Sequence, residues 1–336
     1  MTKLILSTGN IVSGGPSIIR KPGASRSNLE LTNSLRSNFL AAQEHAAEHA
    51  HNGNGTLSVN GKVNGGPNDS AYGSAETLVS ATHAGGRVPV SLWTSEQDGV
   101  LYVPTLSNHH HDARLQEEPS QYDITVKLFF LSNTPVAQRA QHAQEALSLV
   151  LRSLDAPSVD LLIVSFPGMS FEGDCEWEAD RKNAAQGNDS DELGTWPAVE
   201  ALHRAGLAKR LGLAEYGSEK LAHFLEQVQV RPAVNQINIK NCCNVPPPLA
   251  KLASEQGIEL LVHSDCTDIL PKGTLRELLG QGPGGAGLLA GPDETNDAGL
   301  RGDLAPQWVI KYTAVVRDRG VIENKGYFAG AQLENE

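Results

Sequence analysis

The chain has 336 residues, of which 40% are hydrophobic, enough for one large α/β barrel or two ordinary domains with a substantial core. Its 27 lysine and arginine residues against 39 aspartate and glutamate residues give a net charge of −12, with the basic residues scattered along the sequence. Phosphate backbones and anionic membranes repel such a chain at long range, which excludes nucleic-acid and membrane binding as expected functions.

The N-terminus and the cysteines favour a cytoplasmic protein. The apolar run from Leu4 to Leu6 is shorter than a signal peptide requires, and no run approaches the ~20 apolar residues of a membrane span. A disulfide framework or a structural zinc site is not expected, because no C-x-x-C spacing occurs among the four cysteines, Cys175, Cys242, Cys243 and Cys266.

Strand and helix patterns alternate along most of the chain. We expect strands at 4–12, 122–131, 159–167, 208–216, 233–239, 257–265 and 320–324, and helices at 29–47, 136–153, 196–205, 219–228, 247–256 and 304–317. Continuous apolar strands that alternate with amphipathic helices indicate parallel strands covered by helices. This pattern fits both a barrel and an open doubly wound sheet.

Four stretches of low complexity interrupt the pattern. Residues 50–87, 107–120, 174–193 and 280–300 are rich in small and polar residues and poor in large apolar ones. Such segments bury too little apolar surface to offset the entropy of folding, and surface loops tolerate long insertions. We expect disordered insertions in the loops of a single domain spanning 1–336.

Several segments resemble the aldo-keto reductase barrel. The stretches "SVDLLIVSFP", "LAKRLGLAEY", "RPAVNQINI" and "GIELLVHSD" follow the order of strand signatures in that family. The closer resemblance is to a non-catalytic branch, the modifier (regulatory) subunits of glutamate-cysteine ligase, through "LILSTGNIV", "VKLFFLSN", "VNQINIKNCCNVPPPL" and "VVRDRGVIENKGY". The resemblance implies an α/β fold of the (β/α)8 TIM-barrel type.

The same resemblance implies a function. A chain of this branch forms a heterodimer with the glutamate-cysteine ligase catalytic subunit. It would raise the affinity of that subunit for glutamate, relieve its feedback inhibition by glutathione, and so regulate glutathione biosynthesis. Two alternatives stay open: an NADP-dependent aldo-keto reductase with a rearranged active site, and a scaffold that senses NADP(H) in a degenerate pocket.

The catalytic tetrad of the reductase family is incomplete in this sequence. The resemblance puts Lys127 at the position of the family lysine, which lowers the pKa of a catalytic tyrosine there, and Ser165 at the position of the family histidine. The nearest candidates for the family aspartate and tyrosine are Asp98 and Tyr102, which have the wrong spacing. We therefore expect no catalytic residues, with Lys127 as a leftover of the tetrad.

The resemblance also leaves little of a nicotinamide site. Gln236 matches the residue that holds the carboxamide, whereas Ala214 and Glu215 replace a Ser-Asn pair and His263 replaces the aromatic platform. Beyond the last strand, only Lys325 could meet the 2′-phosphate. We expect no cofactor, with NADP as the weaker alternative.

Two pairs of residues are candidates for partner binding. Cys242 and Cys243 follow a strand, where an exposed thiol could form a link with the catalytic subunit. The alternative is that one thiol is packed and the other lies in a turn. Tyr327 and Phe328 follow the last strand, where they would either be exposed to a partner or close the end of the barrel.

Three motifs match known sites only in their letters. "HAAEH" at 45–49 fits a zinc-protease pattern but lies at the end of an alanine-rich helix, and 109–111 is a histidine triplet in a polar loop. "GAGLLA" at 285–290 lacks the strand that must precede a dinucleotide fingerprint. We expect no metal site.

Overall fold

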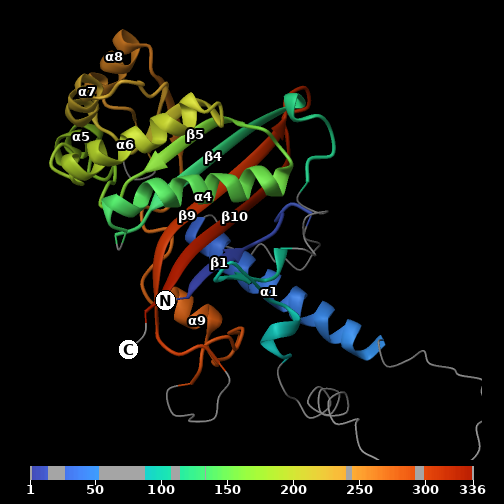
Figure 1. Cartoon of the computed structure of the whole chain (residues 1–336). Helices are drawn as coiled ribbons and strands as arrows, with labels where there is room; N and C mark the ends of the chain where they lie inside the picture. The colour runs from blue at the N-terminus through green and yellow to red at the C-terminus, as the bar shows by residue number, and fades with distance from the viewer. Residues whose placement is uncertain are drawn as a thin grey trace, which may run out of the picture.

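The fold is built on one mixed sheet of ten strands in the order β2-β3-β1-β10-β9-β4-β5-β6-β7-β8 (Figure 1). The computed structural model describes residues 2–13, 27–52, 88–106, 114–132, 134–239, 244–291 and 299–334. The strands are β1 (Lys3–Ser7), β2 (Ser95–Gln97), β3 (Val100–Val103), β4 (Tyr122–Phe130), β5 (Val159–Ser165), β6 (Ala208–Ala214), β7 (Val234–Asn238), β8 (Glu259–His263), β9 (Asp303–Val316) and β10 (Val321–Glu334).

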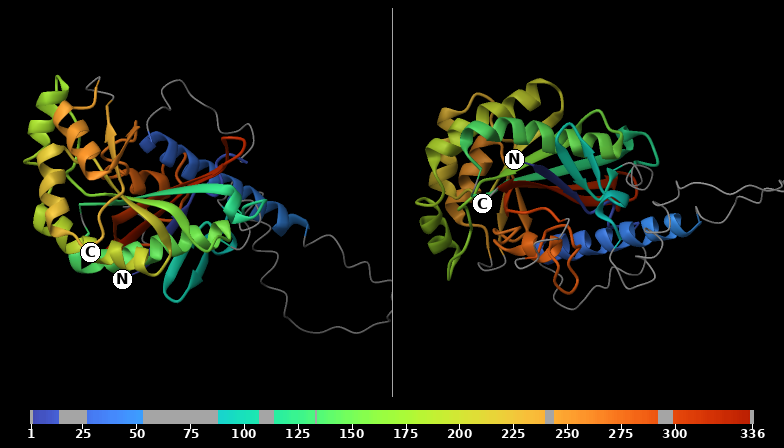
Figure 2. Two further views of the ribbon diagram at one scale, coloured as in Figure 1. Left: turned by 90° about the horizontal axis from the view of Figure 1, so that it is seen from above. Right: turned by 60° about the horizontal axis from the view of Figure 1, so that its bottom comes forward.

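Helices connect the strands and cover both faces of the sheet. They are α1 (Ser27–Asn52), α4 (Val136–Leu154), α5 (Glu176–Asn183), α6 (Asp189–Arg204), α7 (Ser218–Gln227), α8 (Pro247–Gln256) and α9 (Thr274–Leu279), with 3-10 turns η1 (Val90–Leu92) and η3 (Pro119–Gln121). In Figures 1 and 2, α4 to α8 lie together on one side of the parallel strands, and α1 and α9 lie near β1 and β10.

The parallel part of the sheet has the βα organisation that the sequence predicts. β4, β5, β6, β7 and β8 pair in parallel in that order, and a helix lies between each strand and the next along the chain. The α/β class is therefore confirmed. Among the described residues the strand order is open, because no ladder joins the end strands β2 and β8.

Neighbouring side chains of the central strands pack into two different hydrophobic cores. On β4, Val126, Leu128 and Phe130 belong to the larger core beneath α4 and α6, whereas Phe129 belongs to a second core with α1 and α9. This alternation follows from the two-residue repeat of a strand, which points neighbouring side chains to opposite faces. Both faces of the sheet are therefore covered.

The predicted helix at 304–317 is wrong, because this segment is the strand β9. β9 pairs antiparallel with both β4 and β10, so it lies inside the sheet. Pro306 disfavours a helix interior, and the β-branched residues Val309, Ile310 and Thr313 suit a strand. The alternating burial from Ile310 to Val316 is the strand repeat that the sequence analysis missed.

Some of the predicted disordered insertions contain helices or buried residues. The segment 174–193 is not a disordered loop, because it contains α5 and the first turn of α6, where the Asn188 side chain caps the helix by accepting from Asp191 N–H. Within 280–300, Ala286, Leu288 and Leu289 are buried in the second core. Residues 114–120 are described and include the start of η3, while 53–87, 107–113 and 292–298 lie outside the described residues.

Candidate functional site

A cluster of charged side chains lies at the carboxyl ends of the parallel strands. Lys127 comes from β4, Glu215 follows β6, His263 ends β8, Asp265 follows two residues later, and Lys311 comes from β9. These side chains are 4% to 21% exposed. Buried charges are stable only when they are paired, so the partners of each group decide what the site can do.

Asp265 holds two lysines at once. Lys127 and Lys311 are direct cross-strand partners on β4 and β9, an arrangement in which like charges repel. Lys127 Nζ donates to Asp265 Oδ2 at 3.1 Å and Lys311 Nζ donates to Asp265 Oδ1 at 2.8 Å. The single carboxylate therefore offsets the repulsion between the two ammonium groups.

A second acid lies against the histidine, although their close contact lacks the geometry of a hydrogen bond. His263 Nε2 lies 2.7 Å from Glu215 Oε1, and His263 Nδ1 accepts the Asp265 backbone N–H at 3.0 Å. Glu215 Oε2 accepts the Asn238 backbone N–H at 3.1 Å. Glu215 has a φ of 64°, a left-handed conformation that is costly for a residue with a side chain. The contacts to His263 and Asn238 hold Glu215 in place.

The surroundings of the cluster shift two pKa values. Burial lowers the pKa of Lys127, although Asp265 and Glu215 work in the opposite direction. Burial alone would raise the pKa of Asp265, but the charges of Lys127 and Lys311 outweigh it and hold that pKa well below its usual range. Asp265 is therefore an anion at neutral pH.

Among the described residues, none of the tyrosine hydroxyls that form hydrogen bonds has Lys127 as its partner. Four tyrosine hydroxyls make hydrogen bonds elsewhere: Tyr122 to Glu323, Tyr216 to Glu192, Tyr312 to Gly9 and Tyr327 to Glu30. Asp98 lies in the tight turn between β2 and β3, and Tyr102 lies on β3, which β1, β10 and β9 separate from β4. The pair Asp98 and Tyr102 is therefore remote from Lys127 in the sheet.

The predicted cofactor residues are brought into different surroundings. Gln236 has a buried side-chain oxygen without a hydrogen-bond partner in the described structure, so it has an open acceptor. Lys325 Nζ donates to Glu30 Oε2 at 2.7 Å, and the Tyr327 hydroxyl donates to Glu30 Oε1 at 2.6 Å. Lys325 thus joins β10 to α1. Of the expected nicotinamide positions, Glu215 and His263 belong to the charged cluster.

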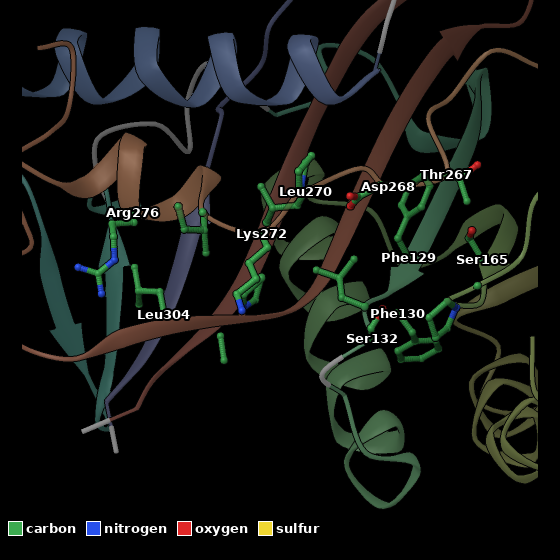
Figure 3. Close-up of a pocket in the computed structure, with 18 of the residues that line it drawn as sticks. Phe129, Phe130, Ser132, Ser165, Thr267, Asp268, Leu270, Lys272, Arg276 and Leu304 are labelled. Atoms are coloured by element: carbon green, nitrogen blue, oxygen red, sulfur yellow. The ribbon is translucent and has the colours of Figure 1, made fainter. Parts of the chain in front are cut away.

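A cavity of about 680 Å³ adjoins this region (Figure 3). Its lining includes Phe129, Phe130 and Ser165, which lie at the ends of β4 and β5. Lys127 Nζ lies 5.0 Å from the centre of the ring of Phe129, which lines the cavity. Ser165, which the sequence resemblance aligns with the family histidine, is 8% exposed and lines the cavity.

The partner-binding candidates have different outcomes. Tyr327 and Phe328 are 0% and 3% exposed, so the structure does not present them as an exposed surface for a partner. They lie inside β10, where Tyr327 belongs to the second core and Phe328 to the larger one. Cys242 and Cys243 lie outside the described residues, and Cys175 and Cys266 are free thiols.

Sequence reasoning missed Asp265 and Lys311, which complete the charged cluster. Asp265 stands in the quoted stretch "GIELLVHSD", directly after a predicted strand, and this position is the signal that could have found it. Lys311 was hidden by the wrong helix prediction for 304–317. With a two-residue repeat, Lys311 would have been a polar residue between the buried Ile310 and Tyr312.

Within the described part of the chain, neither a cluster of metal ligands nor a helix suited to span a membrane is found. They contain no group of three or more histidine, cysteine, aspartate or glutamate residues placed to hold a metal ion. On the exposed surface of α1, the Nε2 atoms of His45 and His49 lie 3.1 Å apart. Among the described helices, none is both long and apolar enough to cross a membrane.

Comparison with known proteins adds a family and relatives. The chain is 29% identical over 228 residues to the putative glutamate--cysteine ligase regulatory subunit of Schizosaccharomyces pombe, covering 64% of this chain and 72% of the yeast protein. It is 28% identical over 137 residues to the glutamate--cysteine ligase regulatory subunits of Mus musculus and Homo sapiens, covering 41% of this chain. The chain spans only 45% of the length of these mammalian relatives.

Solved structures of aldo-keto reductases also match. An aldo-keto reductase of Bombyx mori in complex with NADP is 22% identical over 42% of this chain and 40% of that chain, with a TM-score of 0.30. The aldose reductase of Schistosoma japonicum is 27% identical over 40% of this chain and 43% of that chain, with a TM-score of 0.30. The model of the aldo/keto reductase family matches residues 107–277, more than half of the chain, and the protein therefore belongs to the aldo/keto reductase family.

Proposed function

We propose that this protein is a non-catalytic regulatory subunit that binds the catalytic subunit of glutamate-cysteine ligase and tunes glutathione biosynthesis. The observation that carries the proposal is the likeness to proteins named as regulatory subunits of that ligase, which extends over 228 residues in the yeast relative. The proposal places the protein in the cytoplasm as one half of a heterodimer, without a cofactor of its own.

The geometry around Lys127 supports the non-catalytic part of the proposal. A reductase lysine assists catalysis by acting on a tyrosine hydroxyl that transfers a proton to the substrate. Here the Lys127 ammonium is engaged by Asp265 and lies 3.5 Å from His263 Nδ1. Ser165 replaces the histidine of the family with a short hydroxyl side chain. The local chemistry favours a stable charge network over proton transfer.

Regulation by such a subunit must be differential. A bound subunit changes the properties of its partner only if it binds the substrate-ready conformation more tightly than the inhibited one. By thermodynamic reciprocity, glutamate should then tighten the complex and glutathione should weaken it. The coupling is typically about 5- to 150-fold in affinity, which is within reach of a direct binding measurement.

The test combines a binding assay with two activity assays. The purified chain is mixed with the ligase catalytic subunit, and the KM for glutamate and the inhibition by glutathione are measured with and without it. The chain alone is also assayed on a panel of aldehydes with NADPH. We expect a lower KM, weaker inhibition and no aldehyde turnover.

The opposite results identify the alternative function. Steady NADPH-dependent turnover that disappears in Lys127→Met, without any effect on the ligase, would establish a reductase with a rearranged active site. Absence of both activities would contradict both proposals. Asp155→Asn serves as a matched surface control, because its side chain is 62% exposed and pairs only with Arg114.

The cysteine pair is tested in the same binding assay. We propose that Cys242 and Cys243 add at most a conditional covalent link, because a reducing cytoplasm opposes stable disulfides. Capture of the catalytic subunit by Cys242→Ser with Cys243→Ser should equal that of the wild type in reducing buffer and fall only under oxidation. Cys175→Ser removes an exposed thiol elsewhere and is the control. Loss of capture under reduction would show that the pair contributes packing instead of a link.

A further inference from the structure

The cavity of about 680 Å³ is lined by Asp268 and, apart from it, by Lys272 and Arg276 together with the carboxylates Asp303 and Glu334. In Figure 3, Thr267, Asp268 and Ser165 lie on one side of the pocket, whereas Lys272 and Arg276 lie on the other. This size is within the range of roughly 300–1,000 Å³ that small-molecule sites occupy. Separated charges of opposite sign favour a ligand with both charges.

The acidic side presents a carboxylate together with hydroxyl groups. Asp268 is exposed and makes no hydrogen bond or ion pair with the described residues. Ser165 and Thr267 add two hydroxyl groups to the same side, and neither has a side-chain hydrogen bond to described protein atoms. A carboxylate flanked by hydroxyl oxygens can accept several hydrogen bonds, as an ammonium group with its three donors requires.

The basic side has one lysine that is free to bind an anion. Arg276 is engaged, because it donates to Asp303 Oδ1 at 3.0 Å. Lys272 is exposed and has no ion pair within 4.0 Å among the described residues, although its charge reaches Asp303 and contributes to the lowered pKa of that group. Glu334 also lines this side, and its carboxylate repels an anion. The anionic group of a ligand is therefore expected to bind at Lys272.

The wall between the two sides is apolar. Phe130, Phe166, Leu270 and Leu304 contribute to the apolar part of the lining. Apolar and aromatic surface with a few placed polar groups is the usual composition of a ligand site. An apolar side chain in the middle of a ligand can therefore be buried here while the two ends meet the charges.

We propose that this cavity binds a short zwitterionic peptide, with its ammonium group against Asp268 and its carboxylate against Lys272. The apolar side chain of the peptide packs against the apolar lining of the cavity, which includes Phe130. The site needs neither a nicotinamide nor a carbonyl substrate, and it belongs to this chain alone. It therefore goes beyond the proposed regulation of a ligase and can be tested without the partner.

The probe is alanyl-leucyl-alanine with free termini, titrated calorimetrically into the full chain. Two matched probes remove one charge each: the N-acetylated peptide and the C-terminal amide. Because a hydrogen bond between charged groups contributes more than a neutral one, each modification should weaken binding by about tenfold.

Variants connect each charge of the peptide with a residue. Asp268→Asn should bind the free and N-acetylated peptides equally, and Lys272→Met should bind the free and amidated peptides equally. Both residues are exposed, so the variants should keep the wild-type melting temperature. Asp174→Asn and Lys251→Met change exposed residues outside the cavity lining and should behave like the wild type.

The proposal is overturned if the free peptide does not bind at millimolar concentration or if all three peptides bind alike. It is also overturned if Asp268→Asn and Lys272→Met keep the wild-type preferences. Because no ligase subunit is present in these titrations, a negative result leaves the regulatory function to its own test, and a positive one does not depend on it.

Discussion

At the scale of single residues, Asp265 should contribute to stability because it pairs with two lysines at once. It is the common partner of two cross-strand lysines, the buried Lys127 and the half-buried Lys311. Removing one partner of a buried ion pair leaves an uncompensated charge and typically costs about 3–5 kcal/mol of unfolding free energy. We expect Asp265→Asn to lower the free energy of unfolding by that amount, measured by urea denaturation.

Lys127→Met should cost less than Asp265→Asn, because Asp265 keeps Lys311 as its partner. The control is Asp155→Asn, whose exposed pair with Arg114 should contribute less than about 1 kcal/mol. If Asp265→Asn were no more destabilising than this control, the network of buried charges would not stabilise the fold.

A buried histidine should make stability depend on pH. Burial, assisted by the charge of Lys3, lowers the pKa of His142 from 6.5 to about 4. Above pH 6.5 both the folded and the unfolded states carry a neutral His142. Between pH 6.5 and 4 only the unfolded state takes up the proton, so the folded state loses stability as the pH falls through this window.

His142→Leu should remove this contribution, which we expect to be about 2 kcal/mol between pH 6.5 and 4. The measurement is the difference between wild type and variant in urea midpoints across that pH range. His223→Leu changes a histidine that is 52% exposed and serves as the control. A wild-type profile retained in His142→Leu would show that another group is responsible.

At the scale of elements, β10 joins the two cores of the molecule. Phe328 is buried in the larger core, where its ring stacks with that of Tyr312 at a centroid distance of 6.1 Å. Truncating a buried phenylalanine typically costs about 3–5 kcal/mol, and we expect Phe328→Ala to lower the free energy of unfolding by this amount. Ile322→Ala, on the same strand but 43% exposed, should cost less than about 1 kcal/mol. Equal costs for Phe328→Ala and Ile322→Ala in urea denaturation would show that β10 is not a core strand.

At the scale of the whole molecule, the two cores share the strands of one sheet and should unfold together. Leu35 lies on α1 in the second core, on the face of the sheet opposite α6. We expect Leu35→Ala to lower the urea midpoint by the same amount whether unfolding is followed by far-UV circular dichroism or by tryptophan fluorescence. The expected loss is about 2–5 kcal/mol. Leu40→Ala changes a residue of α1 that is 48% exposed and should have little effect. Two separate transitions in Leu35→Ala would show that the cores fold independently.

The sequence by itself determined the parallel part of the fold and the family. The strands that became β4 to β8 and the helices α4, α7 and α8 lie within a few residues of their predicted bounds, because their hydrophobic periodicity is long and regular. The resemblance to the aldo-keto reductase barrel, based on four strand signatures, agrees with the family match over residues 107–277. Both are local properties of the chain and need no knowledge of distant contacts.

The tertiary structure decided the last two strands and the contacts of the site. β9 lies between β4 and β10 in the sheet, and Tyr327 packs in the second core with its hydroxyl bonded to Glu30 of α1. The ion pair between Lys127 and Asp265 joins residues 138 positions apart. Periodicity and spacing report which side of an element is apolar, whereas the partner of a charge depends on how distant segments pack, so the site could only be assembled from the folded chain.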